Sequence, residues 1–366
     1  MPEGSLESDK HMRYALIGCG RIAPSHIQSA LSNGLEIAGL CDLSLDKAKS
    51  LARRFSLPES LCFSDAGKML ESVKDLGFVS IAADSGSHHD LAMLSFRHGL
   101  DVLTEKPIAM SLADAREMID TARNEGLLLG VCQQNRLNNA SVLVKKAIDR
   151  GAFGTISNAS VAVRWSRSRS YYEEGDWRGK WRTDGGTLMN QCIHGFDLLR
   201  YFCGRDIDTL YAKIANRAHS YIETEDLGLG VIHFSNGILA TAEGTSNVFR
   251  DNLEEVITII GEKGTVKLGG ECAERITLWR FEDEEVDSWK TEEQRFSSVY
   301  GDGHSRVFED FIRSAGSRKR PAVSGEDGYD ALEMVLAFYL SAKEGRPVAF
   351  PLPPFGTEDM EGVALS

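Results

Sequence analysis

At 366 residues the chain is long enough for about two domains. Hydrophobic residues make up 42% of it and charged residues 26%, which is typical of a globular protein and excludes wholesale disorder or a fibrous repeat. Lys and Arg number 41 against 54 Asp and Glu, giving a net charge of −13. This balance argues against nucleic acid or an anionic membrane as the main partner, because both attract positively charged surfaces.

The sequence shows no pattern of a membrane-spanning segment or of a secretory signal. No apolar run approaches the roughly 18–20 residues of a membrane-spanning helix. Residues 1–11 are charged and lack an apolar stretch, so we expect a flexible leader or an expression remnant rather than a secretory signal. The seven cysteines are scattered and show no C-x-x-C spacing, which disfavours a disulfide framework or a zinc site. We therefore expect a cytoplasmic protein with no metal ion.

The N-terminal third alternates short apolar runs with helical stretches. The apolar runs lie at residues 14–17, 35–41, 78–82, 101–103 and 127–131. Before the last of them, Ser111 with Asp114 three residues on is typical of a helix start, and Gly126 suits the residue after a helix end. Strands that alternate with helices form βαβ crossovers. The pattern predicts a doubly wound parallel sheet in a domain spanning residues 12–133.

Residues 134–366 show a different texture. Ala159, Val161, Val163 and Trp165 alternate with polar or small residues, as in a half-buried strand. Asn236-Gly237 separates two further strand-like runs and predicts a hairpin with a type I′ turn. More strands are expected at 256–260, 264–268 and 275–279, an acidic solvated excursion at 281–294, and an amphipathic helix at 329–343. We predict a second, α+β domain built on an open sheet.

A glycine-rich turn connects the first expected strand to the first helix. Gly18, Gly20 and Ala23 form the pattern G-x-G-x-x-A. In such a turn the first glycine permits a tight bend, the second lets the backbone approach a pyrophosphate, and the helix N-terminus offers free N–H groups to the phosphates. Gly18, Gly20, Arg21 and Ile22 are therefore expected to bind a dinucleotide. The alternative is an ordinary glycine turn between a strand and a helix.

Asp42 strengthens the dinucleotide interpretation. It ends the second expected strand, 24 residues after Gly18 (42 − 18), close to the usual spacing of about 20. A carboxylate there accepts hydrogen bonds from both adenosine ribose hydroxyls and repels a 2′-phosphate. The sequence therefore predicts NAD rather than NADP as the cofactor, although a simple turn residue is the alternative.

Two later segments carry candidate catalytic side chains. Glu105-Lys106-Pro107 follows an expected strand at the edge of the sheet where ligands bind in open α/β folds, and a lysine there can move a hydroxyl proton. Gly185-Gly186 leads to Asn190, His194 and Asp197, whose spacing places them on one side of a helix. Taken singly, an exposed loop lysine and a polar helix stripe would explain both segments without catalysis.

The chain resembles the Gfo/Idh/MocA oxidoreductase family over nearly its whole length. The resemblance rests on five features in this order: the glycine turn, Asp42, His88, the E-K-P triplet and the G-G…H-x-x-D segment. The resemblance implies an NAD(P)-binding Rossmann domain and a C-terminal α/β domain with an open, mainly antiparallel sheet. It implies Lys106 and His194 as catalytic residues. It also implies cofactor contacts from the residues Asp84, His88, Glu105, Lys106 and Gln134.

Two positions depart from the family pattern. Ala83-Asp84-Ser85 replaces the usual T-P-N, which affects the contacts on the nicotinamide side. Asn190 stands where the family often has an aspartate four residues before its histidine. A carboxylate-assisted mechanism of the inositol dehydrogenase kind is therefore not expected from that position.

The region from 164 to 194 is similar to the subgroup that oxidises UDP-N-acetylglucosaminuronic acid at its 3-hydroxyl. Between Arg164 and Arg182 six cations and five aromatic side chains face only three acids, although the protein is acidic. Arginine matches phosphate and carboxylate oxygens, and aromatic rings can stack a uracil or a sugar. The expected substrate contacts are Lys106, Arg164, Tyr172, Asn190 and His194. An exposed loop or a subunit contact is the alternative for this cluster.

The leading hypothesis is thus an NAD-dependent dehydrogenase acting on a secondary alcohol of a sugar nucleotide. The same cofactor and catalytic residues would also suit two alternatives: a polyol or sugar dehydrogenase of the inositol or glucose type, and an NAD-dependent glycosidase. A dinucleotide-binding regulator without turnover is a hypothesis of another class, disfavoured by the presence of both Lys106 and His194. An open sheet needs its second face covered, and the family packs subunits sheet to sheet, so we expect a homodimer or homotetramer.

Overall fold

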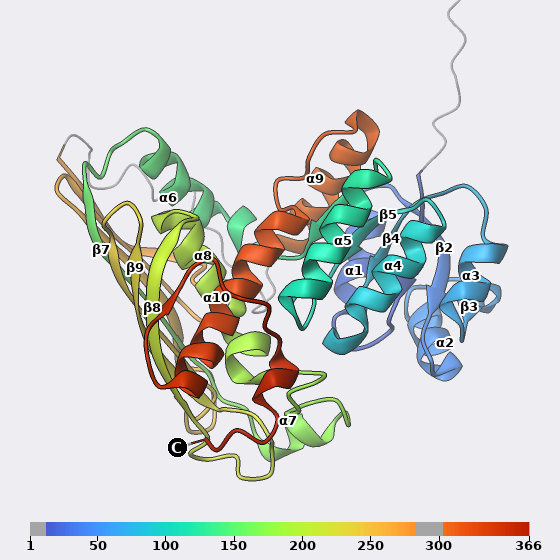
Figure 1. The fold of residues 1–366 in the computed structure, drawn as a ribbon. Helices are drawn as coiled ribbons and strands as arrows, with labels where there is room; N and C mark the ends of the chain where they lie inside the picture. Colours follow the sequence, from blue (N-terminus) through green and yellow to red (C-terminus); the bar gives the residue numbers. More distant parts are fainter. Residues whose placement is uncertain (1–11, 283–302, 366) are drawn as a thin grey trace, which may run out of the picture.

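Two sheets organise the computed structural model, which describes residues 12–282 and 303–365. Figure 1 shows the smaller sheet among helices on both sides, and the larger sheet with helices α8 and α10 between it and the first body. Residues 1–11 and most of the predicted acidic excursion (283–294) lie outside the described residues. No helix among the described residues is both long and apolar enough to cross a membrane.

The first sheet is parallel throughout and has the strand order β3-β2-β1-β4-β5-β6. Its strands are β1 (Arg13–Ile17), β2 (Glu36–Cys41), β3 (Cys62–Phe63), β4 (Leu76–Ile81), β5 (Asp101–Thr104) and β6 (Leu129–Val131). Its helices are α1 (Ala23–Ser32), α2 (Leu45–Arg54), α3 (Ala66–Ser72), α4 (His88–Arg97) and α5 (Leu112–Asn124), with short 3₁₀ turns η1 (Glu59–Leu61) and η2 (Ser85–Ser87). The predicted doubly wound Rossmann domain is confirmed.

Local capping explains where the helices begin and end. The Ser111 side chain accepts a hydrogen bond from Asp114 N at 3.0 Å and so starts α5 as predicted. Gly126 follows that helix with a φ of +65°. Helix α1, in contrast, begins after Ile22 with no side-chain cap and no acidic residue in its first turn. The first backbone N–H groups of α1 already bond to Gly20 O and Ile22 O, so N–H donors for a ligand come from the glycine turn before the helix.

The second sheet has the order β13-β12-β11-β7-β10-β9-β8-β14 and is mainly antiparallel, as expected; among its pairs β7 and β10 run parallel. Its strands are β7 (Ile156–Arg164), β8 (Ile207–Ala215), β9 (Leu227–Phe234), β10 (Leu239–Thr245), β11 (Glu254–Gly261), β12 (Gly264–Gly269), β13 (Arg275–Phe281) and β14 (Val348–Ala349). The helical elements among the described residues of this half are η3 (Gln134–Leu137), α6 (Asn139–Asp149), α7 (Arg169–Glu173), η4 (Leu188–Cys192), α8 (Ile193–Cys203), α9 (Gly303–Ser317), α10 (Gly325–Glu344) and η6 (Thr357–Met360).

The hairpin between β9 and β10 is confirmed, but its predicted turn type is wrong. Gly237 has a φ of +89°, whereas Asn236 does not have a positive φ, so the loop is not a type I′ turn. Phe234 N donates to Ile238 O, and Gly237 N donates to Phe234 O. This is a three-residue loop in which glycine takes the left-handed position. The Asn236 amide instead caps the carbonyl of Cys203, a distant contact that the dipeptide did not reveal.

Helix α9 ties the two halves together. It comes from the second half of the chain, yet Phe308 and Phe311 pack with Tyr14 and Phe78 beside the first sheet. Figure 1 accordingly shows α9 alongside the helices of the first body. The domain boundary between residues 133 and 134 stays a prediction, since packing carries part of the second half into the Rossmann core. One consequence is that residues near 304 reach the ligand cavity.

Candidate active site

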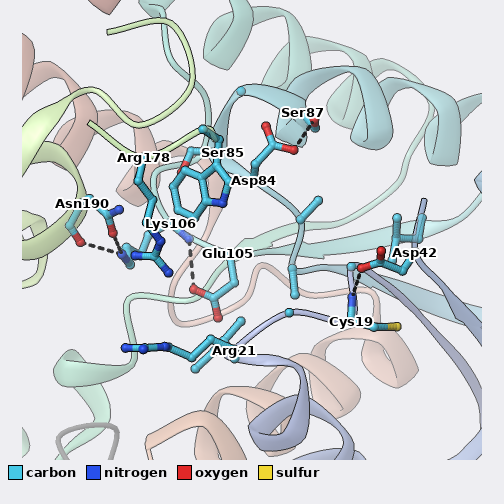
Figure 2. A pocket seen from close by; sticks show the side chains of 18 of the residues that line it. Cys19, Arg21, Asp42, Asp84, Ser85, Ser87, Glu105, Lys106, Arg178 and Asn190 are labelled. Carbon is cyan, nitrogen blue, oxygen red and sulfur yellow. Dashed lines mark hydrogen bonds between the residues drawn. The ribbon is translucent and has the colours of Figure 1, made fainter. Parts of the chain in front are cut away.

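A cavity of about 860 Å³ runs along the carboxyl ends of β1, β2, β4 and β5 and is closed on its far side by residues of the second half. Figure 2 shows Asp42 and Cys19 at one end and Lys106 and Asn190 at the other. This is the place where ligands bind in open α/β folds. The residues that line the cavity include Asp42 at the end of β2, where the adenosine of a dinucleotide is expected, and Lys106 of the E-K-P triplet, where the nicotinamide is expected.

The glycine turn has the geometry that a pyrophosphate requires. Gly18 has a φ of +99°, and a Cβ there would lie 2.4 Å from the Ala82 backbone, so no other residue fits. A Cβ on Gly20 would meet nothing within 4 Å, which leaves open space over that peptide. Gly18, Gly20, Arg21 and Ile22 all line the cavity beside the uncapped start of α1. The residues present therefore fit a dinucleotide phosphate.

Asp42 is fixed at the adenosine end by the backbone around it. Its Oδ2 accepts from Cys19 N and its Oδ1 from Ser44 N, both at 2.9 Å. The carboxylate therefore faces the cavity in one orientation and retains lone pairs for further donors. Such a position suits the two hydroxyl groups of a ribose.

The segment after β4 contributes Asp84 but not His88. Asp84 lines the cavity and accepts a hydrogen bond from Ser87 Oγ at 2.8 Å. His88 is buried and does not line the cavity; its Nδ1 lies 2.7 Å from the Pro107 carbonyl oxygen. Burial lowers the pKa of His88, so the neutral ring donates this bond. His88 was expected to contact the cofactor directly, but it is not among the residues that line the cavity. It instead holds the segment after β4 to the backbone of Pro107.

Glu105 sits in a buried set of hydrogen-bond donors that the sequence did not predict. Its Oε1 lies 2.8 Å from His26 Nε2 and 3.1 Å from His304 Nε2, and the Cys132 thiol also hydrogen-bonds to the carboxylate. Burial alone would raise the pKa of Glu105, but the bonds from His26 and His304 hold it well below its usual range. These four side chains come close enough to hold a metal ion. Their mutual hydrogen bonds account for the arrangement and fix Glu105 beneath Lys106.

Lys106 is held by Asn190 at the other end of the cavity. Its Nζ donates to the Asn190 main-chain oxygen at 2.7 Å and to Asn190 Oδ1 at 3.2 Å. Burial lowers the pKa of Lys106, while the charges of Glu105 and Asp184 oppose that shift. Asn190 lies in a π-helical turn (η4, Leu188–Cys192) that runs into α8, a feature frequent at functional sites. The amine is therefore oriented by Asn190, and burial favours its neutral form.

His194 lies in the first turn of α8 and lines the cavity. Its Nδ1 is 2.7 Å from Gln133 Oε1, and its Nε2 is 3.4 Å from Gln134 Nε2. Burial and the nearby Lys106 lower the pKa of His194 to about 3. The ring is thus neutral, with its proton placed on Nδ1 by the Gln133 acceptor. Nε2 is left to accept a hydrogen bond from Gln134 or from a bound hydroxyl.

Part of the predicted arginine and aromatic cluster reaches the cavity. Its lining members are Trp165, Arg167, Tyr171, Trp177 and Arg178. The guanidinium of Arg178 lies 3.9 Å from the Tyr171 ring centroid, and that of Arg167 lies 5.1 Å from the same centroid. Both Nε atoms are buried and have no hydrogen-bond partner among the described residues. The terminal nitrogens of Arg167 donate to Ser166 O, Asn252 Oδ1 and Gln191 Oε1, and Arg178 lies 4.0 Å from Glu174. Two partly buried cations therefore meet at the Lys106 end of the cavity.

Two of the expected substrate residues do not line it. Arg164 pairs with Glu243 at 2.6 Å and with Glu254 at 2.5 Å on the opposite face of the sheet. Strand alternation explains this, because Trp165 next to it points inward. Tyr172 is buried behind Tyr171, with its hydroxyl 3.5 Å from Ser246 Oγ. The prediction of direct contacts from Arg164 and Tyr172 therefore does not agree with the cavity's lining.

The remaining predicted residues, Glu105, Gln134, Asn190 and His194, do line the cavity with Lys106. Sequence reasoning missed Gln133, which sets the His194 tautomer, and Asp184, which lies behind Asn190. Neither belongs to a motif; both come together with their partners only in the folded chain. Arg21 has an additional role, since it pairs with Glu174 at 2.8 Å across the cavity.

Comparisons with known proteins agree with this geometry. Residues 12–133 match the oxidoreductase family with an NAD-binding Rossmann fold, and residues 145–350 match the C-terminal alpha/beta domain of the same family. The WlbA dehydrogenase of Bordetella pertussis, solved with NADH and UDP-GlcNAcA, is 33% identical with a TM-score of 0.86, over 94% of this chain and 99% of that one. The Chromobacterium violaceum WlbA, with the same ligands, is 32% identical with a TM-score of 0.85, over 94% and 98%.

Curated relatives are more distant in sequence. D-apiose dehydrogenase of Paraburkholderia graminis is 27% identical over 93% of this chain and 90% of its own. Myo-inositol 2-dehydrogenase of Thermotoga maritima is 23% identical over 92% and 98%. The resemblance predicted from the motifs is confirmed, and the chain belongs to the Gfo/Idh/MocA family of oxidoreductases, whose N-terminal domain is an NAD-binding Rossmann fold.

Proposed function

We propose that this NAD-dependent dehydrogenase oxidises the 3-hydroxyl of UDP-N-acetylglucosaminuronic acid (UDP-GlcNAcA). The observation that carries the proposal is the pair Arg167 and Arg178 beside Tyr171, whose Nε atoms are buried and have no hydrogen-bond partner among the residues that the structure describes. Buried cations are costly unless an anion accompanies them. Glu174 lies 4.0 Å from Arg178 but also pairs with Arg21, so it does not balance both Arg167 and Arg178. A substrate with a diphosphate and a carboxylate supplies such anions, whereas an uncharged polyol does not. The WlbA structures, which bind UDP-GlcNAcA, support the same substrate.

Lys106 acts as the general base in this proposal. A neutral amine has two N–H groups and one lone pair, and Asn190 offers two acceptors to the N–H groups. The lone pair is then left for the substrate hydroxyl, and Nζ takes the hydroxyl proton as the hydride leaves the carbon. When bound, NAD⁺ supplies the hydride acceptor. His194 Nε2 carries no proton, because the ring is neutral and its proton lies on Nδ1 facing Gln133, so it accepts a hydrogen bond from a neighbouring hydroxyl of the substrate and orients the sugar.

Replacing Lys106 tests this assignment. Lys106→Met should lower turnover by roughly 10²–10⁴-fold, the usual contribution of a general acid–base group. The NAD dissociation constant should hardly change, because the adenosine and pyrophosphate contacts lie at the other end of the cavity. His194→Ala should lose less, as an orienting residue. Steady-state kinetics and calorimetric NAD titration give both quantities.

The matched control is Lys180→Met, which removes an exposed lysine that does not line the cavity. Near-wild-type turnover in the Lys106→Met variant would show that Lys106 is an ordinary loop residue.

Cofactor preference rests on Asp42. Its carboxylate, fixed by Cys19 N and Ser44 N, favours two ribose hydroxyls and repels a 2′-phosphate. We expect NAD(H) to bind at least about tenfold more tightly than NADP(H), equivalent to ~1.4 kcal/mol. Asp42→Ser should narrow that difference. Calorimetric titration in which NADP binds as tightly as NAD to the unaltered protein would contradict the assignment.

The substrate itself is tested with a panel of UDP-sugars, free uronic acids, glucose and myo-inositol, scored by NADH formation. UDP-GlcNAcA should give the highest kcat/KM, and its binding should weaken with added salt, as expected for an anion in a cationic site. Arg178→Met should raise the KM for UDP-GlcNAcA without changing NAD affinity.

Arg182→Met is the control for Arg178→Met, because Arg182 is exposed and pairs with Glu358 outside the cavity. If myo-inositol or glucose outperforms every nucleotide sugar, the arginine cluster is structural and the polyol or sugar dehydrogenase hypothesis replaces this one.

A homo-oligomer is proposed from the second sheet. The face opposite α8 and α10 exposes large apolar side chains on neighbouring strands: Tyr211, Leu229, Val231 and Leu239. Uncovered apolar area of this kind is typical of an interface. Light scattering at micromolar concentration should give the mass of a dimer or tetramer. Val231→Lys should shift that mass downward, and a monomeric mass for the unaltered protein would contradict the proposal.

A further inference from the structure

Asp184 lies directly behind the residue that holds Lys106. It is 2% exposed and does not line the cavity. Its Oδ1 accepts a hydrogen bond from Asn190 Nδ2, and its Oδ2 accepts one from Gly179 N at 2.7 Å. Asn190 Oδ1 in turn accepts from Lys106 Nζ at 3.2 Å. The three side chains thus form one line of hydrogen bonds that runs from a buried carboxylate to the amine at the reaction centre.

The direction of the Asn190 amide follows from this line. Asp184 as a carboxylate accepts only, so it requires the NH₂ group of Asn190, and Oδ1 must then face Lys106. An amide that donates to a carboxylate also becomes a better acceptor at its oxygen, because hydrogen bonds in a chain polarise one another. Asp184 therefore decides both the orientation and the strength of the contact that Lys106 receives.

We propose that Asp184 is a positioning residue for the general base: through the Asn190 amide it directs the Lys106 amine and supplies the negative charge that Asn190 itself lacks. The inference rests on the proposed role of Lys106 as base. Without Asp184 the amide could turn its NH₂ group to Nζ, and the lone pair of the amine would then be drawn away from the substrate hydroxyl.

The charges around the pair agree with this role. Burial raises the pKa of Asp184 to about 6, against the effects of Gly179 N, the Asn190 amide, and the charges of Arg178 and Lys106. At neutral pH the group is therefore mostly ionised. The charged or titratable neighbours of Lys106 and Asp184 among the described residues are Glu105, Arg167, Tyr171, Tyr172, Arg178, Cys192, His194 and Glu225.

A purely structural role is the alternative, since Asp184 also caps the turn at Gly179. Two nearly isosteric variants distinguish the structural role of Asp184 from its proposed positioning role. Asp184→Asn keeps an oxygen for Gly179 N but removes the charge. The double variant Asp184→Asn with Asn190→Asp exchanges carboxylate and amide, so it keeps the volume, the cap and one negative charge beside Lys106.

The experiment is an NMR titration of Lys106 in protein labelled with [ε-¹³C]lysine, with the signal assigned from Lys106→Arg, in the NAD complex without substrate. Asp184→Asn should lower the Lys106 pKa by about one unit, the lower end of the effect of a nearby opposite charge. The exchanged variant should return it to the wild-type value or above. In turnover assays, the pH at which kcat/KM rises should likewise move to a lower value in Asp184→Asn. It should return to the wild-type value or above in the exchanged variant.

An unchanged Lys106 pKa in Asp184→Asn would overturn the inference, and so would an exchanged variant that behaves like the single one. If Asp184→Asn does not fold, the exchanged variant carries the test, and a lowered Lys106 pKa in it is the contradicting result. Asp226→Asn is the control, because Asp226 caps the backbone at Arg217 and Ala218 without contacting Lys106. The titration needs no substrate, so a failure of the proposed substrate would leave its result intact.

Discussion

A desolvated amine at the end of the cavity is the feature on which the rest of the site depends. As the proposed general base, Lys106 must lose its proton near neutral pH and keep its lone pair free, and both conditions depend on its surroundings. Burial favours the neutral form, while Glu105 and Asp184 limit the shift. The two acceptors of Asn190 take up the N–H groups of the amine. A lysine in an exposed loop would meet none of these conditions.

Those surroundings are assembled from both halves of the chain. Glu105 is anchored by His26 from α1 and by His304 from α9, although these residues are far apart in sequence. The pair Arg21 and Glu174 joins the glycine turn to the segment that carries the arginines. The packing of α9 on the Rossmann core therefore does more than stabilise the fold, because it brings His304 to the carboxylate of Glu105, next to Lys106.

The features that the sequence predicts well are local ones. Gly18 and Asp42 follow from the requirements of a tight turn and of a strand end, and the structure places both in the cavity lining. Long-range contacts could not be foreseen: Gln133 meets His194, 61 residues later, and Glu105 meets His304, 199 residues later. Arg164 is different, since the alternation of Val163 and Trp165 already indicated that it points to the other face of the sheet.

The most direct test follows a single oxidation. The protein is mixed with NAD⁺ and with UDP-GlcNAcA carrying either hydrogen or deuterium at C3, and the formation of reduced nicotinamide is recorded over the first turnover. We expect absorbance of the reduced ring to appear and the deuterium from C3 to be found on that ring, because the hydride leaves that carbon for the nicotinamide. No reduction, or a reduced ring that carries no deuterium from C3, would contradict oxidation at the 3-hydroxyl.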